Sequence, residues 1–427
     1  MVYCFRLSWF PVSIYSFQLV LLPTLLHTMN IQIQRLYELA QRPERRIIGL
    51  MSGTSMDGLD VALCHIKGFG PQTDVSLTHF ETVPYTDDLK AEIRKVFAKK
   101  EIDFQHLCLL NAWIGQLHGQ MVTDCLRQWK LTAADVDLVA SHGQTVFHAP
   151  KSQHRLDKFP NATLQIGDGD HVAVTTGIIT LSDFRQKHIA KGGEGAPLAV
   201  YGDYFIFSKK DENRLMLNMG GIANFTYLPG NLNAEEVFTT DTGPGNTLID
   251  AFTRQFFNQP YDANGQIAAR GTVNQDLLQM LKKDSFFKAP FPKTTGPEVF
   301  NAEYVQRARQ LSQTDEYLTP EDLIATLTRF SAETIAEAIQ TVIKPGEPYS
   351  VYRSGGGMHN PVLTGAIQAL LPDCRFANTD ELGISGDAKE AILFAVLANE
   401  AVAGGYTSFG NRRGVPTVSM GKVSFPN

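Results

Sequence analysis

Two stretches far apart in the chain repeat one pattern, in which a β-type apolar segment, a glycine-containing turn and a second β-type segment follow one another. The first stretch runs from Arg46 to Ile66 around a turn at residues 52–58, and the second runs from Arg214 to Leu228 around Gly220-Gly221. Both indicate a pair of strands joined by a polar glycine turn. We therefore expect two α/β halves facing a cleft, an arrangement that would place both turns on one ligand.

The length of the chain agrees with two domains, because 427 residues with 43% hydrophobic content are too many for one compact core. We predict a first domain over residues 46–205 and a second over 206–385. The C-terminal segment 386–427, helical at 386–403, is expected to return to the first domain. Residues 1–45 are set apart as an N-terminal extension of doubtful origin.

The first 28 residues differ from the rest of the chain. No charged residue lies between Leu7 and Leu26, which raises the question of a signal peptide or a membrane anchor. Pro11 and Pro23 interrupt this run, and no clear cleavage site precedes Met29. We favour the interpretation that Met29 is the true start, and we expect no association with a membrane.

Charge and cysteine content narrow the class of protein further. The net charge of −6 arises from 38 basic and 44 acidic residues without a long run of either sign, so a nucleic-acid partner is not expected. The five cysteines form no CxxC or Cys/His cluster with the spacing of a zinc site. They are typical of reduced thiols in a cytoplasmic protein.

Four glycine-containing turns offer backbone N–H groups to phosphate oxygens, and each follows a predicted strand. In chain order they lie at residues 52–58, 218–224, 241–246 and 354–357. Any one alone would be an ordinary turn, but their coincidence favours nucleotide binding. No GxxxxGK[ST] or GxGxxG motif is present, which argues against P-loop kinases and Rossmann dehydrogenases. Asp57 and Asp241 are the candidate Mg²⁺ ligands. The residues expected to contact the nucleotide are Gly53, Thr54, Ser55, Met56, Asp57, Gly58, Leu59, Asp60, Gly220, Gly221, Asn224, Asp241, Gly243, Gly245, Asn246, Gly355, Gly356 and Gly357.

Polar residues gather after short apolar strands between positions 141 and 195, as the binding of a polyhydroxylated ligand requires. Asp183 is the best candidate for a general base, although a structural pair with Arg185 is an equally good interpretation of the spacing. The glycine-rich loop at 191–197 either closes over a sugar or only begins a helix. The candidate sugar-binding residues are His142, Gln144, Gln165, Asp168, Arg185 and Glu194.

With these motifs, the chain resembles the anhydro-N-acetylmuramic acid kinases from about Ile47 to its C-terminus. The segments that support the resemblance are GLMSGTSMDGLDVAL, SHGQTVFH, LQIGDGDHVA, DFRQKHIAKGGEGAPLA, LNMGGIANFTYL, DTGPGNTLIDAF and SGGGMHNPVL. The resemblance implies an α/β, two-domain actin-like ATPase fold of the hexokinase/Hsp70/actin type, with ATP and Mg²⁺ bound at the interdomain cleft. It also implies the coupled hydrolysis and O6 phosphorylation of a 1,6-anhydro amino sugar in cell-wall recycling, with Asp183 as the base that activates water.

One departure and several alternatives accompany the resemblance. The family usually has an acid where this chain has His188, which makes His188 the competing candidate for the base. Many members also have Gln at the position where this chain has Glu194. A kinase for another anhydro sugar, such as levoglucosan, would share every nucleotide motif. Only a pocket for the lactyl ether would distinguish the two, and the sequence does not identify it. A non-catalytic sugar sensor on the same fold and a homodimer are further possibilities.

Overall fold

The computed structural model describes residues 29–405, 407–410 and 414–427. The expectations about residues 1–28, including the signal peptide or anchor, lie outside the described residues. Within these described ranges, no helix combines the length and the apolar character needed to cross a membrane.

One half of the protein is built on a sheet with the strand order β12-β6-β4-β1-β2-β3. Its first three strands form an antiparallel meander, β4 lies parallel to β1, and β6 lies parallel to β4. The hairpin strand β5 and the C-terminal strand β12 pair antiparallel with β4 and β6. The strands are β1 Glu44–Ser52, β2 Gly58–Lys67, β3 Asp74–Pro84, β4 Leu138–Ala149, β5 Ala162–Ile166, β6 Thr180–Ser182 and β12 Lys422–Ser424.

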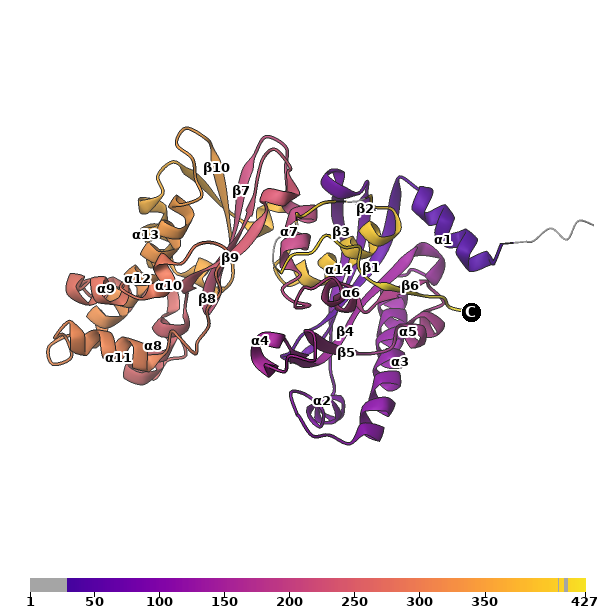
Figure 1. The fold of residues 1–427 in the computed structure, drawn as a ribbon, viewed down its shortest axis with the longest axis horizontal. Helices are drawn as coiled ribbons and strands as arrows, with labels where there is room; N and C mark the ends of the chain where they lie inside the picture. The colour runs from indigo at the N-terminus through magenta and orange to yellow at the C-terminus, as the bar shows by residue number, and fades with distance from the viewer. Residues whose placement is uncertain (1–28, 406, 411–413) are drawn as a thin grey trace, which may run out of the picture.

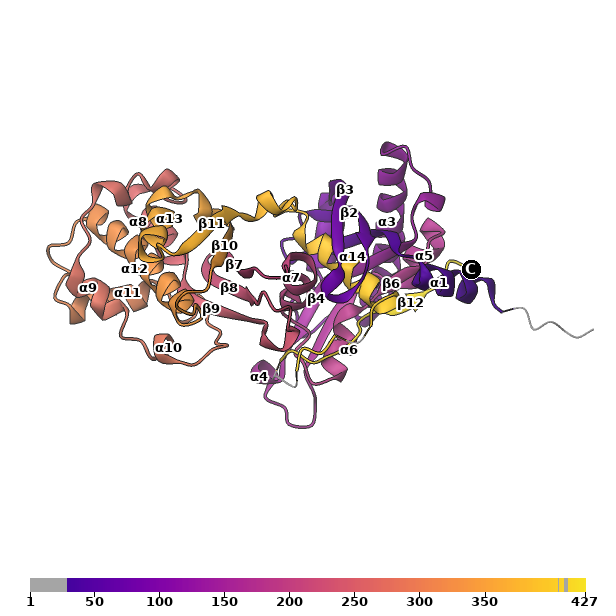
Figure 2. The same cartoon turned by 90° about the horizontal axis from the view of Figure 1, so that it is seen from above.

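The other half repeats this topology with the order β11-β10-β7-β8-β9. An antiparallel meander of three strands is again followed by two strands parallel to its first member. The two sheets lie in separate halves of the molecule (Figures 1 and 2). This repeated topology confirms the predicted actin-like fold. The strands are β7 Asn213–Met219, β8 Ile222–Leu228, β9 Phe238–Pro244, β10 Tyr349–Ser354 and β11 Cys374–Asn378.

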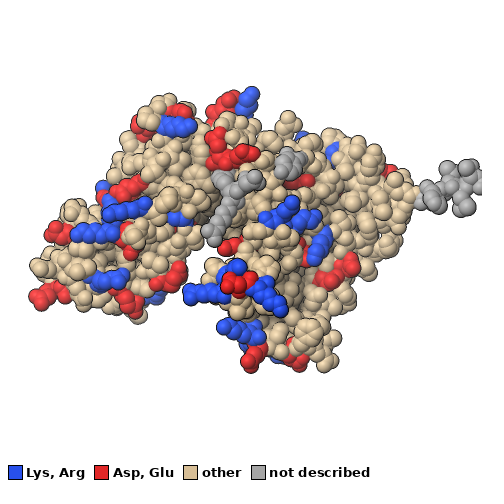
Figure 3. Space-filling model, viewed as in Figure 1, with Lys and Arg blue, Asp and Glu red and all other residues tan. Residues whose placement is uncertain are grey.

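Helices cover both faces of the first sheet, and the surface is hollowed between the two halves (Figure 3). Successive side chains of a strand point to opposite faces, so Ile47 and Ile48 of β1 enter two different hydrophobic cores. One core packs against α2, α3 and α5, and the other packs against α7 and α14. The helices of this half are α1 Ile31–Gln41, α2 Asp87–Arg94, α3 Phe104–Gln128, α4 Lys151–His154, α5 Gly169–Thr176, α6 Phe184–Ala190, α7 Ala199–Phe207 and α14 Lys389–Val402.

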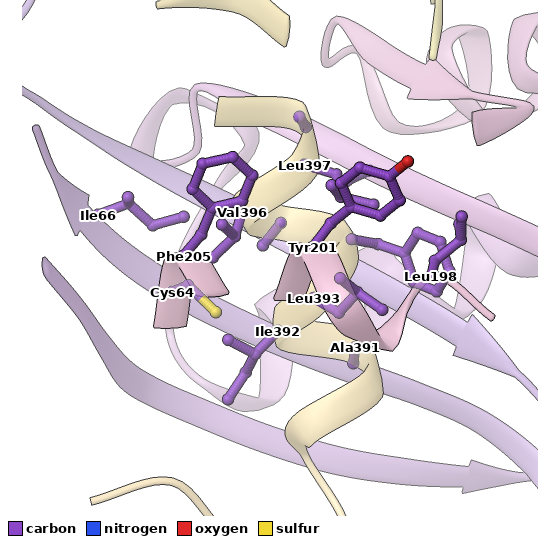
Figure 4. Packing of buried hydrophobic residues seen from close by; sticks show 14 of the residues in the cluster. Cys64, Ile66, Leu198, Tyr201, Phe205, Ala391, Ile392, Leu393, Val396 and Leu397 are labelled. Atoms are coloured by element: carbon purple, nitrogen blue, oxygen red, sulfur yellow. The ribbon is translucent and has the colours of Figure 1, made fainter. Parts of the chain in front are cut away.

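Helix α14 lies directly on β1, although more than 330 residues separate them. A Cβ atom at Gly49 would lie 1.9 Å from the carbonyl oxygen of Ala391, so this close approach requires glycine. Figure 4 shows Phe205 of α7 and Val396 of α14 packed on the side of Cys64 of β2. We propose domain limits near residues 207 and 385, with the C-terminal segment completing the first domain.

Part of residues 31–45 packs into this core, which differs from the expectation that residues 1–45 form a separate extension. Leu39 of α1 is fully buried in the core that contains α14. The guanidinium of Arg45 is also buried, and its Nε donates to Asn399 Oδ1 at 2.6 Å. The sequence does not show this packing because the partner residues lie in the distant helix α14.

The second half carries its helices around one face of its sheet. In the sequence, a Thr319 cap and Pro320 at the first position predict a helix that runs to Ile343. The longest helix of this half, α12, begins there, with Thr319 Oγ1 accepting from the backbone N–H of Asp322 at 3.1 Å and Pro320 in the first turn. It ends three residues before the predicted limit of Ile343. The helices are α8 Thr247–Phe257, α9 Gln275–Leu281, α10 Ser285–Lys288, α11 Ala302–Leu311, α12 Pro320–Gln340 and α13 Pro361–Leu370.

Candidate functional site

A cavity of about 630 Å³ lies between the two halves and is lined by both. The first half contributes Met51 from the end of β1 and Arg185 from α6, while α14 contributes Glu390. The second half contributes residues of β7, β8 and β9 and the end of β10. Among them are Asn218, Asn224, Thr226, Thr239, Ser354 and Gly355.

The second, third and fourth glycine turns pack against one another in the second half. The backbone N–H of Gly245 donates to Gly221 O at 2.8 Å, and that of Asn246 donates to Gly220 O at 2.9 Å. A Cβ atom at Gly245 would lie 2.3 Å from Gly220 O, and one at Gly355 would lie 2.6 Å from Asn218 Oδ1. Glycine is therefore a steric requirement where these turns meet.

A second cavity, of about 440 Å³, opens beside these turns, a size suited to a small ligand. Gly356 and Gly357 of the fourth turn and Asn246 of the third turn line it. Tyr261 lies on the same wall. The structure thus brings two predicted nucleotide turns to one cavity, next to an aromatic side chain that the sequence analysis did not select.

The first turn lies in the other half and is supported by a chain of buried hydrogen bonds. Tyr85 Oη donates to Ser52 Oγ at 2.8 Å, and Ser52 Oγ donates to Gln144 Oε1 at 2.6 Å. The Gln144 amide then donates to Gly53 O at 3.1 Å. Gln144 is fully buried, and its side chain holds the first turn in place, while its binding of sugar stays a prediction.

The residues of the first turn divide into exposed and buried groups. Thr54, Ser55 and Asp57 are exposed, whereas the side chains of Met56 and Leu59 are buried in the core. Neither of these two side chains is available to a ligand. Asp60, partly buried, accepts from Thr82 Oγ1 at 2.6 Å, and burial raises its pKa.

A third cavity, of about 500 Å³, lies beside residues 141–143 of β4 and at the carboxyl ends of β5 and β6 in the first half. It brings together four residues predicted from the sequence, namely His142, Gln165, Asp168 and Asp183. Gln165 donates to Thr163 Oγ1 at 2.9 Å, while its Oε1 is buried without a partner among the described residues. That oxygen is positioned to accept from a hydroxyl group.

Arg185 lies between the third cavity and the interdomain cavity. Its Nε donates to His142 Nε2 at 2.9 Å, and its guanidinium also donates to Gly195 O at 2.6 Å. Burial lowers the pKa of Arg185. The Asp183–Arg185 pair that the spacing allowed does not occur among the ion pairs of the described residues, because Asp183 pairs with Lys422 of β12 instead.

Asp183 occupies the end of β6 in a left-handed backbone conformation, with a φ of 57°, and precedes α6. Its carboxylate accepts from Lys422 Nζ, and both side chains line the third cavity. Lys422 is not among the site residues predicted from the sequence. A lone lysine near the C-terminus has no motif, and only the pairing of β12 with β6 brings it to Asp183.

The loop at residues 191–197 is held by His188 rather than left free. The backbone N–H of Gly195 donates to His188 Nδ1 at 3.0 Å, and the His188 ring is fully buried. His188 lines none of the three cavities, so its position argues against the competing assignment as base. Glu194 is exposed and also lies outside these cavities, so the structure does not bring it to the predicted sugar site.

Asp241 lies on the face of the second sheet that borders the interdomain cavity. It pairs with Asn224 across β8 and β9 and is two residues from Thr239, and both of those residues line the cavity. Burial raises the pKa of Asp241, although its Oδ2 accepts from the backbone N–H of Thr295 at 2.8 Å. The described residues contain no cluster of three His, Cys, Asp or Glu side chains able to hold a metal, and Asp57 lies in the opposite half.

Three buried histidines predict that acid destabilises the fold. Burial lowers the pKa of His118 to about 4, of His142 to about 3 and of His188 to about 4. An unfolded histidine titrates near pH 6.5, so the unfolded chain binds more protons below that pH. The contribution of each histidine is fully present above about pH 6.5 and is lost toward pH 4, by about 1.4 kcal/mol per pH unit.

Urea unfolding at pH 7, 6 and 5 measures this effect. The pH slope of the unfolding free energy should become shallower in His118→Gln, because glutamine does not titrate. Equal slopes for the wild type and the variant would contradict the buried, neutral state of His118.

Comparison with known proteins adds evidence independent of this geometry. Residues 45–418 match the family model described as anhydro-N-acetylmuramic acid kinase. The chain is 54% identical over 402 residues to a protein of that name from Pseudoalteromonas atlantica, covering 93% of this chain and 100% of the relative. It is 37% identical to the protein of the same name from Caldanaerobacter subterraneus subsp. tengcongensis, covering 92% of this chain and 100% of that relative.

Solved structures show only distant likeness. A hexokinase from Schistosoma mansoni complexed with glucose matches with a TM-score of 0.32 and 9% identity, covering 83% of this chain and 85% of the hexokinase. The activator of 2-hydroxyisocaproyl-CoA dehydratase from Clostridium difficile, with bound ADPNP, matches with a TM-score of 0.35 and 11% identity, covering 84% and 95%.

Proposed function

Because the chain belongs to the anhydro-N-acetylmuramic acid kinase family, we propose that it uses ATP to convert 1,6-anhydro-N-acetylmuramic acid into N-acetylmuramic acid 6-phosphate, a step of peptidoglycan recycling. The observation that supports this best is the placement of two sites on either side of the interdomain cavity. A cradle of glycine turns lies in the second half, and a cavity of polar strand-end residues lies in the first.

The glycine cradle fits the nucleotide. Backbone N–H groups without side chains suit phosphate oxygens, and α8 begins directly after Asn246, so its amino end adds a favourable dipole. The cavity beside Gly356 and Tyr261 has room for the adenosine part. A bound Mg²⁺ ion commonly keeps several waters and is coordinated by one or two carboxylates plus phosphate oxygens. Asp57 and Asp241 would therefore be enough to hold it without a dense cluster of acidic residues.

The third cavity fits the sugar. Gln165 offers a buried acceptor, and His142, held by Arg185, lies on the same wall. Polar groups of this kind, fixed by their own hydrogen bonds, orient a polyhydroxylated ligand. The cavity lies in the first half, so the sugar and the nucleotide would meet across the interdomain cavity.

The proposed reaction requires a group that accepts a proton. Water attacks C1 of the sugar, the C1–O6 bond breaks, O6 forms a bond to the γ-phosphorus, and ADP leaves. The proton lost by water passes to a carboxylate of the protein. Bound Mg²⁺ would neutralise charge on the phosphates.

Two carboxylates are candidates for this base. Asp183, which the resemblance implies, lies in the sugar cavity but holds Lys422 in an ion pair. Asp241 lines none of the three cavities and is already proposed as a Mg²⁺ ligand, a role that leaves its carboxylate unsuited to accepting a proton. We therefore infer that Asp183 is the base, and the variants Asp183→Asn and Asp241→Asn separate the two assignments.

Cys108 provides a direct test of the proposed function. It is exposed and lines the third cavity, so 1,6-anhydro-N-acetylmuramic acid should slow its alkylation, measured by mass spectrometry of the Cys108 peptide. Cys374, outside this cavity, is the internal control. ATP consumption should be compared with the same sugar and with levoglucosan. No turnover of the acidic sugar would contradict the proposal, and faster turnover of levoglucosan would favour the alternative substrate.

We further propose that the protein works in the cytoplasm, where ATP is available, and that its partners are small molecules. Size-exclusion chromatography with light scattering would test whether it forms a homodimer.

A further inference from the structure

The third cavity has a charge pattern that the proposed reaction does not explain. Asp168, Asp170 and Asp183 line it, and Lys422 is the single cation among its lining residues. Asp168 is engaged at the start of α5, where its Oδ1 accepts from the backbone N–H of Asp170 at 2.9 Å. A negatively charged ligand that entered this cavity would be repelled by the carboxylates unless a cation met its charge.

Lys422 is held firmly enough to serve as that cation. In the pairing of β12 with β6, Lys422 lies directly opposite Ser182, the residue before Asp183. Met420 is buried in the adjacent core, and Phe425 packs against the same core. The side chain itself is largely exposed, at 65%, so its ammonium reaches both Asp183 and the open space of the cavity.

No other described cation offers the same contact. Arg185 is the nearest alternative, but its guanidinium donates to His142 and Gly195 O and lines the interdomain cavity. An ammonium group has three N–H donors, so Lys422 can keep its bond to Asp183 and still donate to a ligand. Residue 422 also lies beyond the span that the family model matches, residues 45–418.

We propose that Lys422 binds the carboxylate of the lactyl ether and thereby sets the preference of the site for an acidic anhydro sugar over a neutral one. This inference rests on the proposed function, because it names the part of the substrate that the third cavity recognises. Lys422 is thus a specificity-determining residue, and the chemistry at C1 and O6 is left to other groups.

Calorimetric titration of Lys422→Gln with two sugars tests the proposal. Affinity for 1,6-anhydro-N-acetylmuramic acid should fall about tenfold to a hundredfold, as expected for the loss of a hydrogen bond between charged groups. Affinity for 1,6-anhydro-N-acetylglucosamine, which lacks the lactyl group, should change less than threefold. Lys422→Arg should restore most of the affinity for the acidic sugar, and added salt should weaken the binding of that sugar to the wild type more than to Lys422→Gln.

Lys187→Gln is the matched control, because it removes the same charge from an exposed position of α6 outside the cavity. It should bind both sugars like the wild type. An equal loss for both sugars in Lys422→Gln would show that Lys422 only supports the cavity, and unchanged affinity for the acidic sugar would also overturn the proposal. Binding is measured without ATP, so a wild type that binds the acidic sugar but does not phosphorylate it contradicts the proposed function and leaves this result standing.

Discussion

Asp183→Asn should lower kcat by about 10²–10⁴-fold while nucleotide affinity changes little, because asparagine keeps the shape of the side chain but does not accept the proton of water. Asp183 lines the third cavity, in the half of the protein opposite the second, third and fourth glycine turns, so the change leaves those turns intact. Steady-state kinetics measure kcat, and titration with a labelled ATP analogue measures the nucleotide affinity.

Three comparisons distinguish the roles of Asp183 and Asp241. Asp276→Asn, an exposed change on α9, should retain wild-type kinetics. If Asp241 holds Mg²⁺, Asp241→Asn should lose activity that high Mg²⁺ largely restores. If Asp241→Asn loses turnover at every Mg²⁺ concentration and Asp183→Asn does not, the base is Asp241 and the assignment that the resemblance implies is wrong.

Gly245→Ala should weaken ATP binding by about fivefold to a hundredfold, the equivalent of 1–3 kcal/mol for a methyl group forced into a packed site. The new Cβ would lie 2.3 Å from Gly220 O, which belongs to the backbone and cannot rotate away. The second and third turns would separate, and their N–H groups would no longer converge on the phosphates. Fluorescence titration with a labelled ATP analogue measures the loss.

Two further variants keep this prediction testable if Gly245→Ala folds poorly. Gly365→Ala is the control, because no atom lies within 4 Å of its Cβ position in α13, and it should bind ATP normally. Gly221→Ala would meet only Thr247 Oγ1, at 2.7 Å, and should give a smaller loss. Equal ATP affinity in folded Gly245→Ala and the wild type would show that the junction of the second and third turns is not part of the nucleotide site.

The sequence predicts features that depend on neighbouring residues. Both hairpins and the start of α12 follow from local alternation, turn glycines and the Thr319-Pro320 cap. The placement of Gln165 and Asp183 at strand ends likewise follows from the short apolar segments that precede them, whereas His142 lies within β4, which continues to Ala149. The three residues share a cavity because β5 and β6 both pair with β4.

The features that the sequence did not reveal depend on contacts between distant segments. Gln144 has the appearance of a ligand-binding amide, but the fold buries it against Ser52 and Gly53, 91 or more residues earlier. Lys422 reaches Asp183 across 239 residues of chain. His188 is similar, since only the folded loop shows that its ring accepts from Gly195 instead of facing a substrate.

The placement of α14 and β12 also determines when each half can form during synthesis. All strands of the second sheet come from residues 213–378, so that half can fold as soon as this stretch leaves the ribosome. The first half needs α14 against β1 and β12 against β6, so its core stays incomplete until residues 422–424 have been translated. The half that is translated first is therefore the half that is completed last.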